Sequence, residues 1–434
     1  MNDSTSLNNL SDERRAAEFD EDIRDALKAF DIENGSMRED SGYSQQRSTW
    51  RSDISAYSSK DPTAARQAQP TGLPFPTGTK VDYLDGSLTI GIVLGQGASG
   101  TVTQAIGEAD QHIVKFPLLG EEAQLVRERT VFESQKITDI KGAAFLQDVD
   151  TIRNPSDGEE ALVGISNFVP GNDMTHHLKK TPKSPGEVAG ILGGISRTLH
   201  DAHRQGVAHM DVKPGNTVMK PDGTPVTVDW GLVQPIGVAK QFAMGTPRFM
   251  APEVATGNYH VSGKADVYSA AMIGVRLATG TNHRSSMYPM AEQIINSQPV
   301  DIHLASDELL PVILKRASET DPAKRTSSLD LMTDLAAYPQ ARQMYDANDM
   351  TTVIENLRAR SGAANRNTAL DATVAKGLLE DLPPTHPRHA TIAAIAARSP
   401  GLRVDAEGVA EKQPAFATAS QESTVIIESA RPRR

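Results

Sequence analysis

The sequence predicts an α+β arrangement, or two lobes, with unpacked segments at both ends. In residues 83–340, strand-like β-branched runs come first and helical patterns dominate after Pro185, an order typical of α+β folds. Hydrophobic residues make up 38% of the 434 residues, below the roughly 45–50% of an ordinary globular chain. We therefore expect one sizeable core in the middle of the chain and little packing elsewhere.

Charge and residue usage exclude several classes of function. The chain has 44 basic and 55 acidic residues, and the net charge of −11 argues against non-specific binding to nucleic acid or anionic lipid. It contains no cysteine, which rules out disulfides, thiolate metal sites and cysteine nucleophiles. No apolar run approaches the roughly 20 residues of a membrane helix, and residues 1–10 lack the features of a secretory signal. These observations favour a cytoplasmic location without a membrane span.

The first 80 residues are predicted to be a disordered region, because they are rich in serine and charge and poor in β-branched clusters. Within it, apolar side chains recur at helical spacing between residues 12 and 31. This short amphipathic helix either binds a partner or packs on the chain's own downstream domain. Residues 69–79 contain three prolines and are interpreted as a linker.

The remaining elements follow from periodicity. Strand-like runs are expected at residues 88–94, 100–106, 112–116 and 162–168. A helical extension is expected over residues 341–400, with helices at 351–360, 368–382 and 387–398. Residues 401–434 are interpreted as a disordered tail.

A glycine-rich segment at residues 95–102, GQGASGTV, lies between two strand-like runs. This hairpin context argues against a dinucleotide-binding βαβ unit, in which such glycines open a helix. Glycine allows a backbone to lie against phosphate oxygens with its N–H groups pointing at them. An ordinary glycine-rich hairpin is an equally good interpretation of this segment alone.

Lys115 ends an apolar strand, HIVKF, and a buried ammonium needs an anionic partner. Nucleotide phosphates and a carboxylate from the predicted helix at residues 121–137 could supply it. That helix offers Glu128 and Glu133, and we prefer Glu128 because it lies one turn before an apolar residue. The alternative is a surface lysine whose stem alone is covered.

Two further segments concentrate polar groups. Residues 209–216, HMDVKPGN, place an aspartate, a lysine and an asparagine close together, which suits a base, a phosphate-binding cation and a metal ligand. Thirteen residues later Asp229 follows a strand-like run and precedes Trp230-Gly231, a good position for a cation ligand. The motifs GTPRFMAPE (245–253), KADVYS (264–269) and DPAKR (321–325) complete the series.

Taken together and in this order, the motifs of residues 83–340 resemble the eukaryotic-type serine/threonine protein kinase family. The resemblance implies a two-lobed protein kinase fold, with a small antiparallel-sheet N-lobe and a mostly helical C-lobe. It implies ATP and Mg²⁺ as cofactors and protein serine or threonine hydroxyls as acceptors. Lys213 two residues after Asp211, together with Thr246, matches the serine/threonine branch of the family.

The resemblance also implies a role for each matching position. Asp211 orients the acceptor hydroxyl and takes its proton, Lys213 stabilises the moving phosphoryl group, and Asn216 and Asp229 hold Mg²⁺. Lys115 contacts the α- and β-phosphates and pairs with Glu128. The expected nucleotide-binding residues are Gly95, Gln96, Gly97, Ala98, Ser99, Gly100, Val102, Lys115 and Glu128. Two structural roles are implied as well: a buried ion pair between Glu253 and Arg325, and Asp266 accepting backbone N–H bonds from residues 209–216.

Some positions depart from the family pattern. Met210 replaces the usual arginine before the catalytic aspartate, the non-RD pattern, and residues 232–245 contain no Ser, Thr or Tyr. We therefore predict activity that needs no phosphorylation within residues 232–245. Gly215 stands where arginine-directed kinases often carry an acidic residue, which argues against a strong basic consensus, although Asp173 could meet one basic residue. Ser166 falls at the gatekeeper position and predicts a pocket behind the adenine.

Two other functions fit parts of the motif pattern less well than an active protein kinase does. A pseudokinase scaffold is the main alternative, but such proteins commonly lose the lysine or aspartates that are retained here. A small-molecule kinase is disfavoured by Thr246 and by the Ala-Pro-Glu triplet at 251–253. The serine-rich N-terminus with its amphipathic helix resembles proteins exported by bacterial type III systems, which include virulence kinases acting on host signalling proteins. The alternative is an ordinary cytoplasmic kinase with a regulatory tail.

Overall fold

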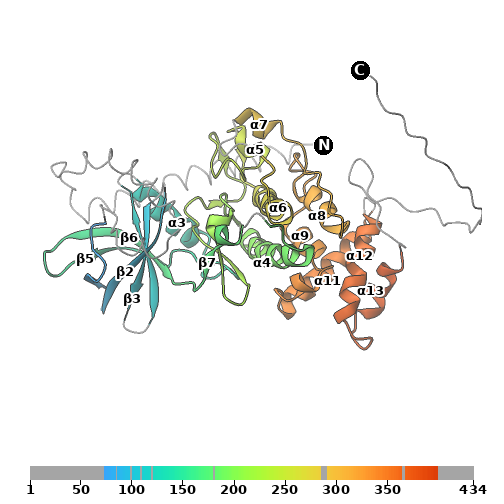
Figure 1. The fold of residues 1–434 in the computed structure, drawn as a ribbon, viewed down its shortest axis with the longest axis horizontal. Coiled ribbons are helices and arrows are strands. Elements are labelled where there is room, and N and C mark those ends of the chain that lie inside the picture. Colours follow the sequence, from blue (N-terminus) through green and yellow to red (C-terminus); the bar gives the residue numbers. More distant parts are fainter. Residues whose placement is uncertain are drawn as a thin grey trace, which may run out of the picture.

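The structure is a computed structural model that describes residues 73–398, except for 85, 98–99, 108–109, 119–120, 179–180, 285–290 and 364–366. It has two lobes (Figure 1): a β-barrel with one helix at one end of the molecule and a larger helical lobe beside it. The α+β prediction is confirmed for these residues. The predicted N-terminal helix, most of the N-terminal region and the tail at 401–434 lie outside the described residues.

The N-lobe is a closed antiparallel barrel with the strand order β1-β2-β3-β4-β6-β5. Alternating apolar residues such as Ile90, Val114 and Val163 fill its interior, while the intervening residues face outward. A single helix, α3, follows β4. The bounds of these elements are β1 Lys80–Tyr83, β2 Gly86–Gly97, β3 Gly100–Ile106, β4 Gln111–Pro117, α3 Glu122–Ser134, β5 Asp148–Arg153 and β6 Glu160–Asn167.

Two sequence expectations for this lobe need correction. The four expected strands are present, but β1 and β5 were missed, and their pairing at Asp82 and Arg153 closes the sheet into a barrel. The predicted linker was wrong at its C-terminal end. Phe75 is fully buried and packs edge-on against Phe116, with ring centroids 6.1 Å apart. The hydrophobic effect therefore ties this proline-rich stretch to the barrel, despite its linker-like composition.

The C-lobe is organised around α4 (Pro185–Arg204) and α6 (Gly263–Thr279). Helix α4 begins with a capping box between Ser184 and Glu187, and most of its residues are buried. Gly280 ends α6 in the left-handed conformation that glycine adopts without strain (φ 71°). The remaining helices of this lobe are η3 Met174–His177, η4 Pro214–Asn216, α5 Pro252–Ala255, α7 Ala291–Ile295, α8 Leu309–Ala317, α9 Ser328–Leu335 and α10 Pro339–Arg342.

Short strand pairs hold the loops of the C-lobe in place. A three-stranded sheet has the order β10-β9-β7, and two separate pairs join β8 with β11 and β12 with β13. The bounds are β7 Asn172–Asp173, β8 Val207–Ala208, β9 Thr217–Met219, β10 Pro225–Thr227, β11 Gln234–Pro235, β12 Ala239–Lys240 and β13 Tyr259–His260.

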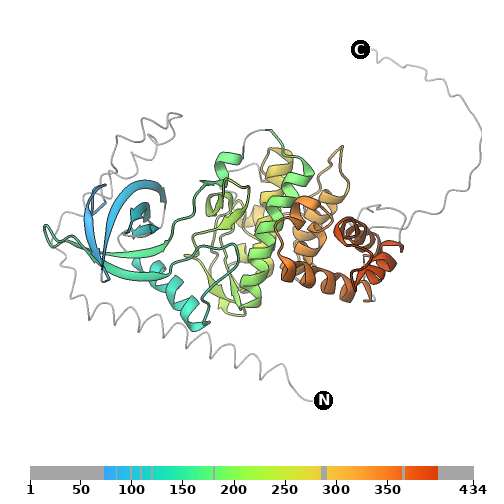
Figure 2. The same ribbon diagram turned by 90° about the horizontal axis from the view of Figure 1, so that it is seen from below.

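The helical extension is continuous with the C-lobe core. Its helices, α11 (Ala347–Ser361), α12 (Thr368–Asp381) and α13 (His389–Ala396), lie close to the predicted ranges. Figures 1 and 2 show them at the end of the molecule opposite the barrel. Arg360 joins α11 to α9 and α12 through ion pairs with Asp334 and Asp371, 2.5 and 2.8 Å away. The extension is thus fixed to the lobe by ion pairs as well as apolar packing. Across the described residues, no helix is long and apolar enough to span a membrane.

Candidate active site

Asp266, buried at the start of α6, fixes the loop at residues 209–216. Its carboxylate accepts backbone hydrogen bonds from His209 and Met210, both 2.8 Å long. His203 on α4 contacts the same carboxylate at 2.9 Å. The expectation that Asp266 holds this loop is therefore confirmed, and the loop is fixed by backbone contacts that do not depend on its own side chains.

Asp211 lies at the centre of a compact polar cluster with Lys213 and Thr246. One carboxylate oxygen of Asp211, Oδ2, is 2.6 Å from the ammonium of Lys213. The other, Oδ1, accepts hydrogen bonds from the backbone N–H and the hydroxyl of Thr246, at 2.8 and 2.7 Å. The Lys213 ammonium also donates to the Thr246 hydroxyl at 3.1 Å. A carboxylate, an ammonium and a hydroxyl in mutual contact can orient an acceptor hydroxyl, take its proton and balance developing negative charge.

Gly245 makes the contact between Thr246 and Asp211 possible. Its φ of +97° is unfavourable for a residue with a side chain, and a Cβ at this position would lie 2.5 Å from the carbonyl oxygen of Met210. The backbones of the two segments therefore touch at this point. This close approach brings Thr246 within hydrogen-bonding distance of Asp211.

Lys115 and Asp229 form a direct ion pair between the lobes, with 2.6 Å between Nζ and Oδ1. Lys115 is almost fully buried on β4, whereas the Asp229 side chain is 38% exposed. Burial disfavours both charges, but each stabilises the other: the pKa of Lys115 is raised and the pKa of Asp229 is lowered. Both groups are therefore charged at neutral pH. In such a pair the ammonium can bind a polyphosphate while the exposed carboxylate binds the cation that accompanies it.

The structure does not form the expected ion pair between Lys115 and Glu128. Glu128 is buried on α3, and its Oε1 accepts a hydrogen bond from the Leu146 N–H at 2.8 Å. Burial raises the pKa of Glu128 to about 7, although Lys115 and the Leu146 N–H act in the opposite direction. Asp229 forms the ion pair with the Lys115 ammonium instead. Glu133, the reserve candidate, is exposed and pairs with Arg129 at 2.8 Å.

The glycine-rich segment ends β2 and begins β3, and Gly97 pairs with Gly100, as the hairpin prediction requires. Gly100 has a φ of +143°, and a Cβ there would lie 2.1 Å from the Phe116 carbonyl oxygen, so the start of β3 lies directly against β4. A Cβ on Gly95 or Gly97 would meet nothing within 4 Å, which leaves their backbone open to a ligand. Gln96 donates to the Thr101 hydroxyl at 3.2 Å and Val102 pairs with Lys115 in register, while Ala98 and Ser99 lie outside the described residues.

The residues near Asp229 fit a divalent cation that is also held by phosphates. The side-chain amide nitrogen of Asn216 donates to the Asp211 carbonyl and carboxylate at 3.0 and 3.2 Å, so its amide oxygen is the group suited to a metal. Within the described part of the chain, no group of three or more His, Cys, Asp or Glu residues could hold a metal alone. A cation bound through Asp229 and Asn216 would therefore complete its ligands from phosphates and water, as Mg²⁺ commonly does.

An aromatic stack connects the loop at residues 209–216 to α3. The ring centroids of His209 and Trp230 are 4.5 Å apart, and Trp230 meets Phe132 on α3 edge-on at 5.8 Å. Phe132 in turn stacks on Phe145 at 4.2 Å. Because Trp230 is fully buried, the position of α3 is coupled by packing to the segment that carries Asp229.

Two buried arginines support the segment after Thr246. Arg325 pairs with Glu253 through two hydrogen bonds of 2.7 and 2.8 Å, which confirms the predicted ion pair. Sequence reasoning missed Arg284, whose guanidinium donates to the carbonyl oxygens of Pro247, Arg248 and Met250 at 2.9 to 3.1 Å. It follows α6 in a stretch with no recognisable motif, so no sequence signal pointed to it.

Comparison with known proteins shows which family the chain belongs to. A family model described as "Protein kinase domain" matches residues 88–340, which is more than half of the chain. This chain belongs to the protein kinase family. The match covers both lobes of the kinase and includes every residue of the polar cluster described above.

Individual relatives of the kinase are distant. It is 26% identical over 255 residues to "Serine/threonine-protein kinase AfsK" of Streptomyces coelicolor, covering 56% of this chain and 31% of the relative. "Serine/threonine-protein kinase pkn3" of Myxococcus xanthus is 26% identical over 313 residues, covering 65% and 56%. "Protein kinase 3" of Dictyostelium discoideum is 28% identical over 201 residues, covering 42% and 21%. The kinase thus spans between about a fifth and just over half of the length of these relatives.

Proposed function

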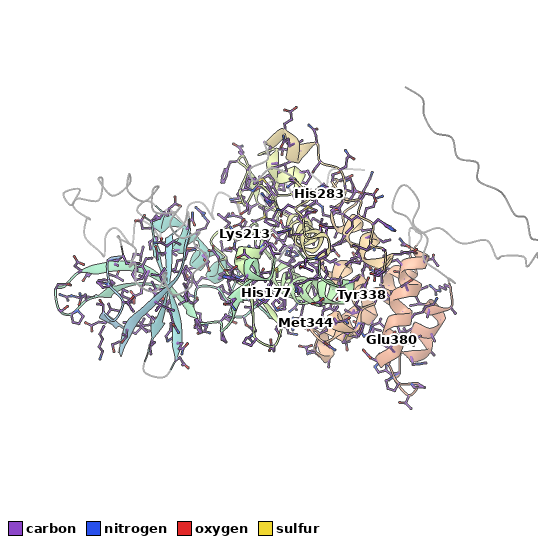
Figure 3. All side chains as sticks on the ribbon, in the orientation of Figure 1. His177, Lys213, His283, Tyr338, Met344 and Glu380 are labelled. Carbon is purple, nitrogen blue, oxygen red and sulfur yellow. The ribbon has the colours of Figure 1, made fainter. Side chains whose placement is uncertain are left out.

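We propose that this kinase transfers the γ-phosphate of ATP to serine and threonine hydroxyls of protein substrates. The observation that carries the proposal is the cluster in which the Asp211 carboxylate contacts both the Lys213 ammonium and the Thr246 hydroxyl. The cluster lies in the middle of the molecule, where Figure 3 labels Lys213. Phosphoryl transfer asks mainly for positioning and charge stabilisation, and these groups supply both.

Each residue has a role that follows from its surroundings. Asp211 accepts the proton of the acceptor hydroxyl, and Lys213 offsets negative charge on the transferring group. Lys115 binds phosphate oxygens near the end of β2, where the backbone of Gly95 and Gly97 is open to a ligand. Asp229 and Asn216 would hold Mg²⁺, which supplies charge neutralisation on the phosphates when bound. Because Lys115 already lies 2.6 Å from Asp229, the phosphate-binding and cation-binding groups are adjacent before any ligand arrives.

We further propose that the kinase needs no phosphorylation within residues 232–245. Backbone pairing orders this segment: β12 pairs with β13, and the Gly237 N–H donates to the Val261 carbonyl at 2.9 Å. Val238 and Met244 are buried in the same apolar cluster as Met210. Met210, which replaces the usual arginine, is thus part of this apolar cluster. Packing in the cluster would order residues 232–245, as a bound phosphate does in kinases that carry the arginine.

A transfer assay tests the proposal. Purified full-length protein is incubated with labelled ATP, Mg²⁺ and a generic protein substrate, beside a Lys115→Met variant. We expect label on phosphoserine or phosphothreonine from the wild type and its loss in the variant, with no phosphate on residues 232–245 of the active enzyme. Label equal in both proteins, or found on tyrosine alone, would contradict the proposal. ATP binding without transfer, even after eukaryotic cell extract is added, would identify a pseudokinase scaffold.

Export by a type III system, with host signalling proteins as substrates, remains a separate prediction from the sequence of residues 1–80. Most of this segment lies outside the described residues, so the prediction depends on composition and on the amphipathic pattern alone. A reporter fused to residues 1–80 tests it directly: delivery into host cells that requires a functional secretion system supports export. Retention of the reporter in the bacterium would favour the cytoplasmic alternative.

A further inference from the structure

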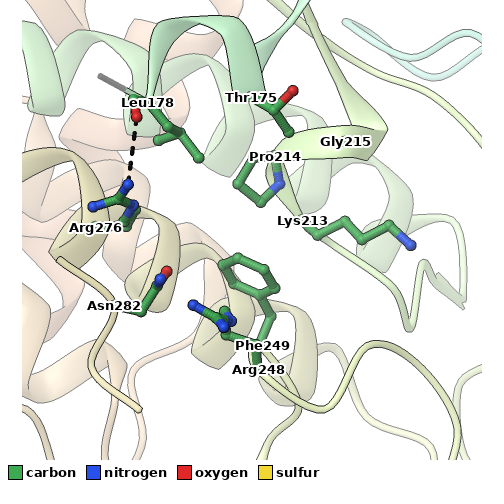
Figure 4. Close-up of a pocket in the computed structure, with 9 residues that line it drawn as sticks. All are labelled: Thr175, Leu178, Lys213, Pro214, Gly215, Arg248, Phe249, Arg276 and Asn282. Carbon is green, nitrogen blue, oxygen red and sulfur yellow. Dashed lines mark hydrogen bonds between the residues drawn. The ribbon is translucent and has the colours of Figure 1, made fainter. Parts of the chain in front are cut away.

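A pocket of about 450 Å³ opens beside the catalytic cluster. Residues from four segments line it, as Figure 4 shows: Thr175 and Leu178, the stretch Lys213 to Gly215, Arg248 and Phe249, and Arg276 with Asn282. Lys213 belongs to both the pocket and the catalytic cluster, where its ammonium contacts Asp211. The pocket therefore adjoins the position at which a substrate would present its hydroxyl to Asp211.

The pocket lining is basic: the Lys213 ammonium is paired with Asp211, whereas its two arginines have no ion-pair partner among the described residues. Three of its nine residues are Lys or Arg and none is acidic. Among the described residues no carboxylate lies within 4 Å of the Arg248 or Arg276 guanidinium, in contrast to Arg325 and Arg342, which have ion-pair partners. Within the described part of the chain, the Arg276 side chain makes a single long hydrogen bond, 3.4 Å, to the Leu178 carbonyl. The pocket therefore presents two arginines with unused hydrogen-bonding capacity in a protein of net charge −11.

Asp173, the residue that the sequence suggested for receiving a basic side chain, already has partners within its own segment. Its carboxylate accepts hydrogen bonds from the N–H and the hydroxyl of Thr175 and lies 3.2 Å from His176. It caps the short helix η3 and is absent from the pocket lining. The sequence-based suggestion that Asp173 receives a basic substrate residue stays a prediction, since its side chain is 37% exposed but does not line this pocket. Gly215 contributes no carboxylate either, so none of the residues that line the pocket is suited to a basic side chain.

We propose that the pocket selects protein substrates carrying an anionic side chain, a carboxylate or a phosphate, within about three residues of the acceptor hydroxyl. The inference rests on the proposed kinase activity and adds its substrate class. An extended peptide advances about 3.3 Å per residue, so a side chain two or three positions from the acceptor reaches a pocket that adjoins Lys213. Guanidinium groups bind carboxylates and phosphates through paired hydrogen bonds, which makes Arg248 and Arg276 the specificity residues.

A positional peptide library measures this preference. Each position within five residues of a fixed Ser or Thr is varied among Glu, phosphothreonine, Ala and Arg, and initial rates are measured with the full-length protein. Hydrogen bonds between charged groups are stronger than those between neutral groups, so we expect Glu or phosphothreonine to exceed Ala about tenfold or more at one position. Comparing the rates of the Glu peptides with those of the phosphothreonine peptides tells whether a carboxylate or a phosphate is preferred. An active enzyme with a flat profile, or with a preference for Arg, would overturn the inference and leave the proposed function intact.

Charge reversal in the pocket provides the matched test. Arg248→Glu and Arg276→Glu should each reduce the anionic preference, and the double variant should favour Arg at the same position. Arg358→Glu, an exposed position on α11, makes the same exchange outside the pocket and should leave the profile unchanged. Thermal melting of each variant checks folding, and Arg276→Gln replaces Arg276→Glu if the latter melts early. An unaltered profile in the folded double variant would refute the assignment.

Binding separates failure of this inference from failure of the proposed function. Fluorescence polarisation of a labelled Glu-containing peptide and its Arg-containing counterpart needs no catalysis. We expect tighter binding of the acidic peptide to the wild type, with reversal of that order in the double variant. If the acidic peptide binds preferentially but no peptide is phosphorylated, the proposal that the pocket binds anionic side chains stands and the proposal of phosphoryl transfer is wrong. Equal binding of both peptides counts against the pocket whatever the rates are.

Discussion

Replacing Glu128 by glutamine should make the kinase more stable above neutral pH and change little in acid. Glu128 is buried on α3 and is not a partner in the ion pair that Lys115 forms with Asp229. Burial raises its pKa from 4.5 to about 7. Glutamine keeps an acceptor oxygen for the Leu146 N–H and removes only the charge that burial penalises.

The sign and the size follow from proton linkage. Between pH 4.5 and pH 7 the folded protein keeps a proton on Glu128 that the unfolded chain has lost, so the stability falls as the pH rises. One pKa unit corresponds to about 1.4 kcal/mol, so the full shift amounts to about 3 kcal/mol. The wild type should therefore lose about 3 kcal/mol relative to Glu128→Gln across this interval, with the difference levelling off above the folded-state pKa.

Urea unfolding of both proteins at a series of pH values from 5 to 8 measures this difference. Other titrating groups cancel in the comparison because both proteins contain them. Glu133→Gln, at an exposed position of the same helix, controls for the loss of one carboxylate. A free-energy difference between wild type and Glu128→Gln that stays constant from pH 5 to 8, or that changes in the opposite direction, would refute the reasoning.

Three further predictions concern individual contacts. Gly245→Ala places a Cβ 2.5 Å from the Met210 carbonyl oxygen, so we expect the rate of phosphoryl transfer to fall by about 10²-fold. Circular dichroism should show that the variant is folded, and a wild-type rate would count against this reasoning. Glu253→Gln leaves the fully buried Arg325 without its counter-ion and should cost about 3–5 kcal/mol in urea unfolding, a loss below 1 kcal/mol being inconsistent with a buried pair. Ser166→Met fills the predicted gatekeeper pocket and should weaken inhibition by bulky ATP-competitive analogues; equal inhibition of both proteins would argue against that pocket.

Much of the fold and the polar cluster could be predicted because local sequence signals determine them. The strands β3 and β4 carry alternating or continuous apolar residues, and α12 follows a clear helical period. The order of motifs pointed to Asp211, Lys213 and Thr246, whose contacts depend on short loop segments held by Asp266.

The remaining features depend on contacts between distant segments. Closure of the barrel needs β1 to meet β5 at Asp82 and Arg153, which no local pattern encodes. Phe75 looked like part of a linker because only the assembled barrel provides the cavity that it fills. Whether Lys115 pairs with Asp229 or Glu128 depends on how α3 and the segment that carries Asp229 lie relative to β4, which a sequence does not display.

The most direct test of the central claim is the transfer rate of Asp211→Asn compared with the wild type at equal occupancy by ATP. Asparagine keeps an acceptor for Thr246 but cannot take a proton, and general-base catalysis contributes about 10²–10⁴-fold. We predict a rate loss of at least 100-fold with unchanged ATP affinity, whereas Asp222→Asn, in the exposed turn between β9 and β10, should leave the rate intact. Equal rates for Asp211→Asn and the wild type would contradict the assignment of Asp211 as the catalytic base.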